Sequence, residues 1–160
     1  MKILVISDTH IPRSAQDLPE AIYKEIETAD MIIHAGDFVE KEMLDKLKAL
    51  RDTRAVCGNM DSNDIRRILK PKEIFSVGKV KIGLIHGYGA PANLVDTVKS
   101  EFKDVDAIIF GHSHAALNIV KDGILFFNPG SPTDKIFAQA NTYGILEVND
   151  NKIEGKIVRI

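Results

Sequence analysis

Short, continuous apolar runs alternate with amphipathic segments in the first part of the chain. The apolar runs cover residues 2–7, 31–35 and 53–57, and each is typical of a strand buried on both faces. Segments with apolar residues at helical spacing lie between them, at about residues 18–29 and 40–50. This order of strand, helix, strand, helix, strand predicts a parallel sheet with right-handed crossovers.

The first predicted helix carries start signals of its own. Pro19 falls in the expected first turn, and Glu20 lies three residues after Asp17, which is the spacing of a capping box. We therefore expect the Asp17 side chain to cap this helix.

The second part of the chain is richer in strands. Pairs of apolar runs joined by short polar turns predict hairpins over residues 73–87, 117–128 and 143–160. A helix at about residues 91–102 and a buried strand at 106–110 lie between the first two hairpins. We expect an α/β fold in which two stacked mixed β-sheets are flanked by helices, an αββα sandwich.

Length and composition are those expected of one globular domain over residues 1–160. Hydrophobic residues make up 44% and charged residues 28% of the chain, and no repeat, low-complexity tract or linker interrupts it. The formal net charge of -2 argues against a protein that holds long nucleic acid by bulk electrostatics. It permits a small phosphorylated substrate that is bound at a metal.

Nothing in the sequence indicates export or insertion into a membrane. Cys57 is the only cysteine, so no disulfide can form within the chain, and we expect it to be a small buried hydrophobe. The apolar run of residues 2–7 is too short for a signal peptide or a membrane span. We expect a cytoplasmic protein without a membrane partner, whose free sheet edges are available for pairing in a homo-oligomer.

Polar clusters follow five of the apolar strands. In chain order they are Asp8-Thr9-His10, Gly36-Asp37, Gly58-Asn59, His86-Gly87 and Gly111-His112-Ser113-His114. Ligands of open α/β sheets gather at the carboxyl ends of the strands. If the five strands share one sheet, all of these side chains converge on one rim.

The residue types in these clusters favour a transition metal. Carboxylate, imidazole and amide oxygen suit Mn, Fe, Zn or Ni better than Ca or a thiolate-bound metal. Asp8 and His10 are two residues apart, as are His112 and His114. In extended chain that spacing places both side chains of a pair on one face, so each pair can converge on one site.

The five motifs, in this order, resemble the signature of the calcineurin-like metallophosphoesterases over almost the whole chain. They are most similar to the small single-domain bacterial and archaeal phosphodiesterases of that family. The resemblance implies one metal on Asp8, His10 and His114, a second on Asn59, His86 and His112, and Asp37 as the bridge.

The resemblance also implies a reaction and its cofactors. It implies hydrolysis of small phosphodiesters by a metal-bridging hydroxide, with Asp37, Asn59 and His86 as catalytic residues. Its cofactors would be two divalent transition metals, Mn first and Ni, Fe or Zn as alternatives.

The third motif departs from many members of the family. They carry a histidine after Gly-Asn that is thought to assist the leaving group, whereas this chain reads Gly58-Asn59-Met60-Asp61. Met60 cannot donate a proton. This substitution favours a diesterase that relies on good leaving groups or on water.

Four further residues are candidates for contacts with substrate. Arg13 follows the first motif, and Arg66 and Arg67 follow Asn59, so each could reach a phosphate oxygen. Taken alone, all three arginines are more simply explained as solvated side chains. Ser131 lies in Asn128-Pro129-Gly130-Ser131, which resembles a further family loop near the site and could shape the pocket.

Two polar residues near the motifs have simpler explanations. His34 matches no ligand position, so we expect strand packing or support of the site from behind. Asp61 is expected to cap the helix that follows it.

Other functions compete with phosphodiester hydrolysis. Phosphomonoesterase or nuclease activity would use the same chemistry, although mild acidity and the lack of a basic–aromatic stretch argue against tight binding of long polymers. A non-catalytic scaffold is the alternative of a different class, because some relatives of this fold are protein-binding modules in membrane-trafficking coats. All seven ligand positions are filled here, which favours the enzyme.

Overall fold

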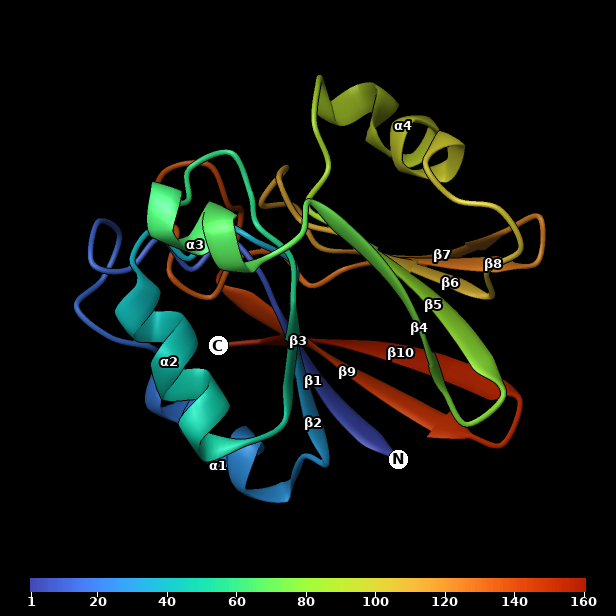
Figure 1. Ribbon diagram of the computed structural model, residues 1–160, viewed down its shortest axis with the longest axis horizontal. Coiled ribbons are helices and arrows are strands. Elements are labelled where there is room, and N and C mark those ends of the chain that lie inside the picture. Colours follow the sequence, from blue (N-terminus) through green and yellow to red (C-terminus); the bar gives the residue numbers. More distant parts are fainter.

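The computed structural model describes all 160 residues and places the strands in two five-stranded sheets (Figure 1). The strands are β1 (Lys2–Ile6), β2 (Met31–His34), β3 (Thr53–Ala55), β4 (Lys72–Val77), β5 (Val80–Ile85), β6 (Ala107–Ile109), β7 (Leu117–Lys121), β8 (Ile124–Asn128), β9 (Thr142–Asn149) and β10 (Lys152–Arg159). The helices are α1 (Glu20–Thr28), α2 (Lys41–Leu50), α3 (Asn63–Ile68), α4 (Leu94–Ser100) and the short 3-10 helix η1 (Pro91–Asn93).

Both sheets are mixed, as the sequence predicts. The first has the strand order β10-β9-β1-β2-β3 and the second the order β4-β5-β6-β8-β7. The pairs β1-β2, β2-β3, β5-β6 and β6-β8 are parallel. The three predicted hairpins are confirmed as the antiparallel pairs β4-β5, β7-β8 and β9-β10.

Two-sided burial explains the continuous apolar runs. On β1, Ile3 and Val5 face the core between the two sheets, whereas Leu4 and Ile6 face the core beneath the helices. Successive side chains of a strand point to opposite faces, so a strand covered on both faces needs apolar residues at every position.

Helices cover the outer faces of the two sheets (Figure 1). Ile22 of α1 and Leu44 of α2 pack in the core on the outer face of the first sheet. Leu94 and Val98 of α4 pack with Ile108 on the outer face of the second sheet. No helix is both long enough and apolar enough to cross a membrane.

The expected cap of the first helix is wrong. Helix α1 begins at Glu20 with Pro19 in the capping position, so Asp17 lies too early in the chain to reach the helix terminus. Its carboxylate instead accepts the Leu18 N–H at 2.8 Å and pairs with Lys46 at 2.6 Å. Asp17 therefore joins the start of α1 to α2.

The five strands that carry the motifs do not share one sheet. Strands β1, β2 and β3 belong to the first sheet, whereas β5 and β6 belong to the second. The five carboxyl ends still meet, because the sheets are stacked with these ends on the same side. The motifs are thus joined across the gap between the sheets.

Candidate metal centre

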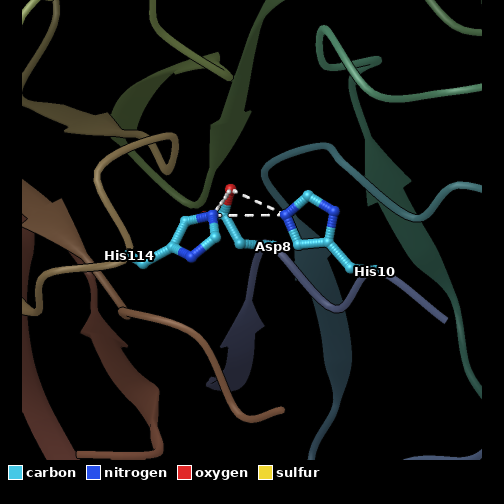
Figure 2. A group of neighbouring side chains, drawn as sticks. All are labelled: Asp8, His10 and His114. Carbon is cyan, nitrogen blue, oxygen red and sulfur yellow. Dashed lines mark hydrogen bonds and ion pairs between the residues drawn. The ribbon is translucent and has the colours of Figure 1, made fainter. Parts of the chain in front are cut away.

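Side chains from both sheets converge where β1, β2, β5 and β6 end. Asp8, His10 and His114 form one group of potential metal ligands, with donor atoms within 4.8 Å of one another (Figure 2). Asp8, Asp37 and His86 form a second group of the same kind. Because Asp8 belongs to both, the two groups are adjacent parts of one centre.

The distances in the first group suit a shared ion. His10 Nε2 lies 3.2 Å from His114 Nε2, and His114 Nε2 lies 3.4 Å from Asp8 Oδ1 (Figure 2). Nitrogen ligands bind a transition metal at about 2.1 Å, which places two neighbouring ligand atoms about 3.0–3.4 Å apart. Two of the three ligand pairs have this spacing, and the third, His10 Nε2 to Asp8 Oδ1, is wider at 4.0 Å. Three donors of these types so close together fit a metal.

The second group has similar distances, and the amide oxygen of Asn59 lies beside it. His86 Nε2 lies 3.1 Å from Asn59 Oδ1 and 3.3 Å from Asp37 Oδ2. The same Asp37 oxygen is 3.7 Å from His10 Nε2 in the first group. Asp37, a member of the second group, thus also comes close to a histidine of the first group.

The outer ring nitrogens of three histidines are held by acceptors. His86 Nδ1 donates to the Ala35 carbonyl at 2.8 Å, His114 Nδ1 to Asp134 Oδ2 at 2.6 Å, and His112 Nε2 to the Gly89 carbonyl at 3.0 Å. A carbonyl or carboxylate oxygen can only accept, so in the neutral ring each of these nitrogens carries the proton. The other nitrogen keeps its lone pair, which is how metal-binding histidines are usually oriented.

His112 is not part of either group of converging side chains. Its backbone N–H donates to both carboxylate oxygens of Asp8, at 3.2 and 3.1 Å, and its ring stands edge-on to that of His86 with 5.4 Å between centroids. His112 lines the same pocket as four other predicted ligands, His10, Asp37, Asn59 and His114. The structure therefore places His112 at the rim of the centre.

The carboxylates make the centre attractive to positive charge. Burial opposes a charge on His86, but the hydrogen bond to Asp37 and the charge of Asp8 outweigh it and raise the pKa of His86 to about 9. The pKa of His114 also rises to about 9, because Asp8 and Asp134 outweigh burial. A divalent cation would satisfy the same carboxylates.

Five of the seven predicted ligands have a backbone conformation that only glycine adopts freely. Asp8, His10, Asp37, His112 and His114 have φ angles of 53°, 44°, 61°, 70° and 55°. The expectation that each pair is extended is therefore wrong, although both pairs reach the site. Left-handed backbone at a residue other than glycine costs about 1–3 kcal/mol and recurs at functional sites. Hydrogen bonds such as Asp8 N–H to the Gly36 carbonyl, at 3.0 Å, hold it in place.

Asp61 supports the second group from behind and is not a helix cap. Its Oδ2 accepts the N–H groups of Asp37 at 3.1 Å and Gly58 at 2.7 Å, and its Oδ1 accepts that of Val39 at 2.8 Å. Ser62, rather than Asp61, occupies the position before α3. Asp61 thereby joins the loop that carries Asp37 to the loop that carries Asn59.

Asp134 supports the first group and was missed in the sequence. Besides His114 it accepts the N–H groups of Ile136, Phe137 and Ala138, at 2.8, 3.0 and 2.8 Å. These contacts outweigh burial and hold the pKa of its carboxyl at about 2. No motif marks Asp134, because its partner is twenty residues away in the chain.

Comparison with known proteins identifies the family. A family model described as the calcineurin-like phosphoesterase superfamily domain matches residues 1–151. The chain belongs to the calcineurin-like phosphoesterase superfamily. This assignment is consistent with the two adjacent groups of potential metal ligands in the structure.

Individual relatives extend this assignment. A probable metallophosphoesterase of Methanocaldococcus jannaschii is 38% identical over 100% of this chain and 82% of its own length. The crystal structure of wild-type Vps29 of Entamoeba histolytica, complexed with Zn²⁺, is similar with a TM-score of 0.76 and 26% identity over 99% of both chains. A structure described as a novel archaeal phosphodiesterase has a TM-score of 0.72 and 26% identity over 99% of this chain and 100% of its own.

The candidate substrate residues of this metallophosphoesterase lie in different places. Arg13 lines a pocket of about 460 Å³ above the metal centre. Arg66 instead donates to the backbone carbonyls of Asp61 and Asn59, and so fixes the Asn59 loop. Arg67 is 77% exposed and pairs with Asp64 at 3.3 Å, so the structure does not bring it to the pocket.

Ser131 lies beneath the site rather than in the pocket. It is fully buried, and its hydroxyl donates to the Asp8 carbonyl at 2.7 Å. The same oxygen accepts the Asp134 N–H at 3.0 Å. Ser131 therefore links the backbone of the first motif to the loop that carries Asp134.

His34 and Cys57 pack within the fold and belong to neither group of potential ligands. His34 is fully buried and stacked on Phe38, and its ring contacts Thr9 Oγ1 at 3.1 Å and the Gly36 N–H at 3.2 Å. Burial lowers the pKa of His34 well below its ordinary value, so the ring is neutral. Cys57, which was expected to be buried, is only half-buried against the core beneath the helices, and burial raises the pKa of its thiol.

Proposed function

We propose that this protein is a binuclear metal-dependent phosphodiesterase that acts on small phosphodiesters. The observation that carries the proposal is the adjacency of the two ligand groups, with Asp37 Oδ2 within 3.7 Å of a histidine nitrogen in each. A site for a single ion would need only one of the groups.

The proposed division of ligands follows the family pattern. Asp8, His10 and His114 hold one ion, and Asp37 bridges it to the other. The second ion takes Asn59, His86 and His112. The acceptors on the outer nitrogens of His86, His112 and His114 leave the other ring nitrogen of each as the one available to a metal, which supports these roles.

Bound divalent ions would supply Lewis acidity and a water acidified for in-line attack on phosphorus. The residues of the chain fix the geometry around that reaction. Asp37 Oδ1 accepts the Met60 N–H at 2.7 Å, which holds the carboxylate so that Oδ2 faces the ligands. Arg13, the only arginine or lysine that lines the pocket, would pair with a non-bridging phosphate oxygen.

Met60 cannot assist the departure of the leaving alcohol. This side chain lines the pocket but has no proton to give. The proposal therefore favours diesters whose alcohol leaves as a stable anion or takes its proton from water. Manganese is the first choice of metal, with nickel, iron or zinc as alternatives, because the ligands are carboxylate, amide and imidazole.

Hydrolysis of bis-p-nitrophenyl phosphate with Mn²⁺ tests the proposal. The wild-type protein should turn over this diester and bind two ions per chain by metal analysis. Asp37→Asn should lose at least about 100-fold in kcat, because the variant has one anionic oxygen fewer between the ions. Asp64→Asn, at an exposed position on α3, is the matched control and should keep its activity.

A non-catalytic scaffold is the competing function, since Vps29 structures share this fold. Two results would contradict the diesterase: no turnover by wild-type protein that carries two ions, or equal turnover by Asp37→Asn. The first result would favour the scaffold.

A further inference from the structure

Two large apolar side chains stand exposed beside the metal centre. Ile136 is 81% and Phe137 76% exposed, more than any other large hydrophobic residue of the chain. Exposed apolar residues are common, so exposure alone decides nothing. These two, however, line the same pocket as five of the seven predicted ligands, together with Met60 and Pro91.

The loop that carries Ile136 and Phe137 is fixed to the metal centre. Asp134 accepts the N–H groups of both residues while its Oδ2 also accepts from His114 Nδ1 at 2.6 Å. Asn141 Nδ2 donates to the Asp134 carbonyl at 2.7 Å and closes the loop from the other side. The Phe137 ring stands edge-on to the His114 ring, with 6.0 Å between centroids. The aromatic ring is thus held at a defined distance from a predicted metal ligand.

The pocket therefore has a polar floor and an apolar wall. Its polar lining includes five of the predicted ligands, and its apolar lining includes Met60, Ile136 and Phe137. A phosphoryl group on the floor would direct its ester substituents toward the wall. Arg13 is the only arginine or lysine in the lining, so a second anionic group on the substrate would find a single partner.

We infer that Ile136 and Phe137 form a binding site for an uncharged aromatic ester group of the substrate, so that the protein prefers aryl or nucleobase-bearing phosphodiesters over alkyl ones. This inference rests on the proposed diesterase activity. An aromatic group would stack against Phe137 and contact the Met60 thioether, both favourable interactions for a planar ring. Covering these side chains would also remove their apolar surface from water.

A pair of substrates with the same leaving group tests the inference. Bis-p-nitrophenyl phosphate and methyl p-nitrophenyl phosphate both release p-nitrophenolate and differ only in the group that is retained. Phe137→Ala should lower the ratio of kcat/KM for the aryl over the methyl diester roughly tenfold, mainly through KM, because one ring–ring contact is lost. Val120→Ala, which removes a side chain 71% exposed and outside this pocket, is the matched control. An unchanged ratio in Phe137→Ala would overturn the inference.

A binding measurement separates this inference from the proposed activity. The chain contains no tryptophan, so Phe137→Trp introduces a single indole reporter at the wall. Titration of the metal-loaded variant with phenylphosphonate and methylphosphonate, which have no ester bond to hydrolyse, should give roughly tenfold tighter binding of the phenyl compound. Equal affinities would refute the aromatic site even in an active enzyme. A clear preference in a protein that hydrolyses neither diester would support the site and refute the activity.

Discussion

Asp61 allows a quantitative test of how the site is held together. Its carboxylate is 5% exposed and accepts three backbone N–H groups, from Asp37, Val39 and Gly58. A buried donor that loses its partner costs about 1–3 kcal/mol. Asp61→Ala leaves all three donors unpaired. We expect the free energy of unfolding to fall by about 4 kcal/mol, which is less than three full penalties because water that enters the site would satisfy some of the donors.

Asp61→Asn should have a smaller and separable effect. If its amide oxygen takes the place of Oδ2, the bonds to Asp37 and Gly58 survive and only the Val39 N–H is lost. One unpaired buried donor predicts a loss of about 2 kcal/mol. The three proteins should therefore rank wild type, Asp61→Asn, Asp61→Ala in stability.

Urea unfolding in the presence of a chelator measures these differences without a contribution from bound metal. With a slope of about 2 kcal/mol per molar urea, the midpoints should fall by about 1 M for Asp61→Asn and about 2 M for Asp61→Ala. Asp64→Ala is the control, because Asp64 is 70% exposed and pairs only with Arg67, and it should cost less than about 0.5 kcal/mol. A loss below about 1 kcal/mol in Asp61→Ala would refute the view that this carboxylate joins the two loops.

Three further outcomes are expected. Asp134→Asn removes the anionic partner of His114 Nδ1, and Mn²⁺ affinity should fall about 10- to 100-fold by titration calorimetry; unchanged affinity would contradict the supporting role. The metal-free pKa of His86 and of His114 is about 9, so both are protonated at neutral pH and the ion must displace those protons. Mn²⁺ affinity should therefore rise from pH 6 to pH 9 with release of protons, and a flat profile would count against these ligands. In Gly58→Ala the new Cβ would lie 2.1 Å from Asp37 Oδ1, so the Asp37 carboxylate must move and metal binding should weaken. If metal analysis still finds two bound ions, the position of the Asp37 carboxylate is not needed for metal binding.

The strand pattern could be predicted because it depends on local rules. The alternation of Ile3 and Val5 with Leu4 and Ile6 between two cores leaves an uninterrupted apolar run that can be recognised in the sequence. Apolar runs do not say which sheet a strand joins, since strands of either sheet are buried alike. The division of the motif strands between two sheets could therefore not be predicted from the sequence.

The supporting residues could not be predicted for a related reason. Asp61 has the sequence context of a helix cap, and only the folded chain brings the N–H groups of Asp37 and Val39 to it. Asp134 lies in a loop without a motif, and its partner His114 comes from another strand end. Candidate ligands can be proposed from residue type and order, whereas the groups that orient them depend on distances between remote segments.

The placement of one centre between two sheets has a consequence for the chain as a polymer. His10 and His114 are 104 residues apart in sequence, and their ring nitrogens face each other at 3.2 Å. An ion shared by the two would close a loop of that length, as a covalent bridge does. In the chain-entropy description a bridge across about 100 residues stabilises the native state by roughly 5 kcal/mol, by restricting the unfolded ensemble. With a single cysteine, the chain cannot form an internal disulfide. The bound ion would instead act as a reversible cross-link, controlled by the supply of metal and not by redox conditions.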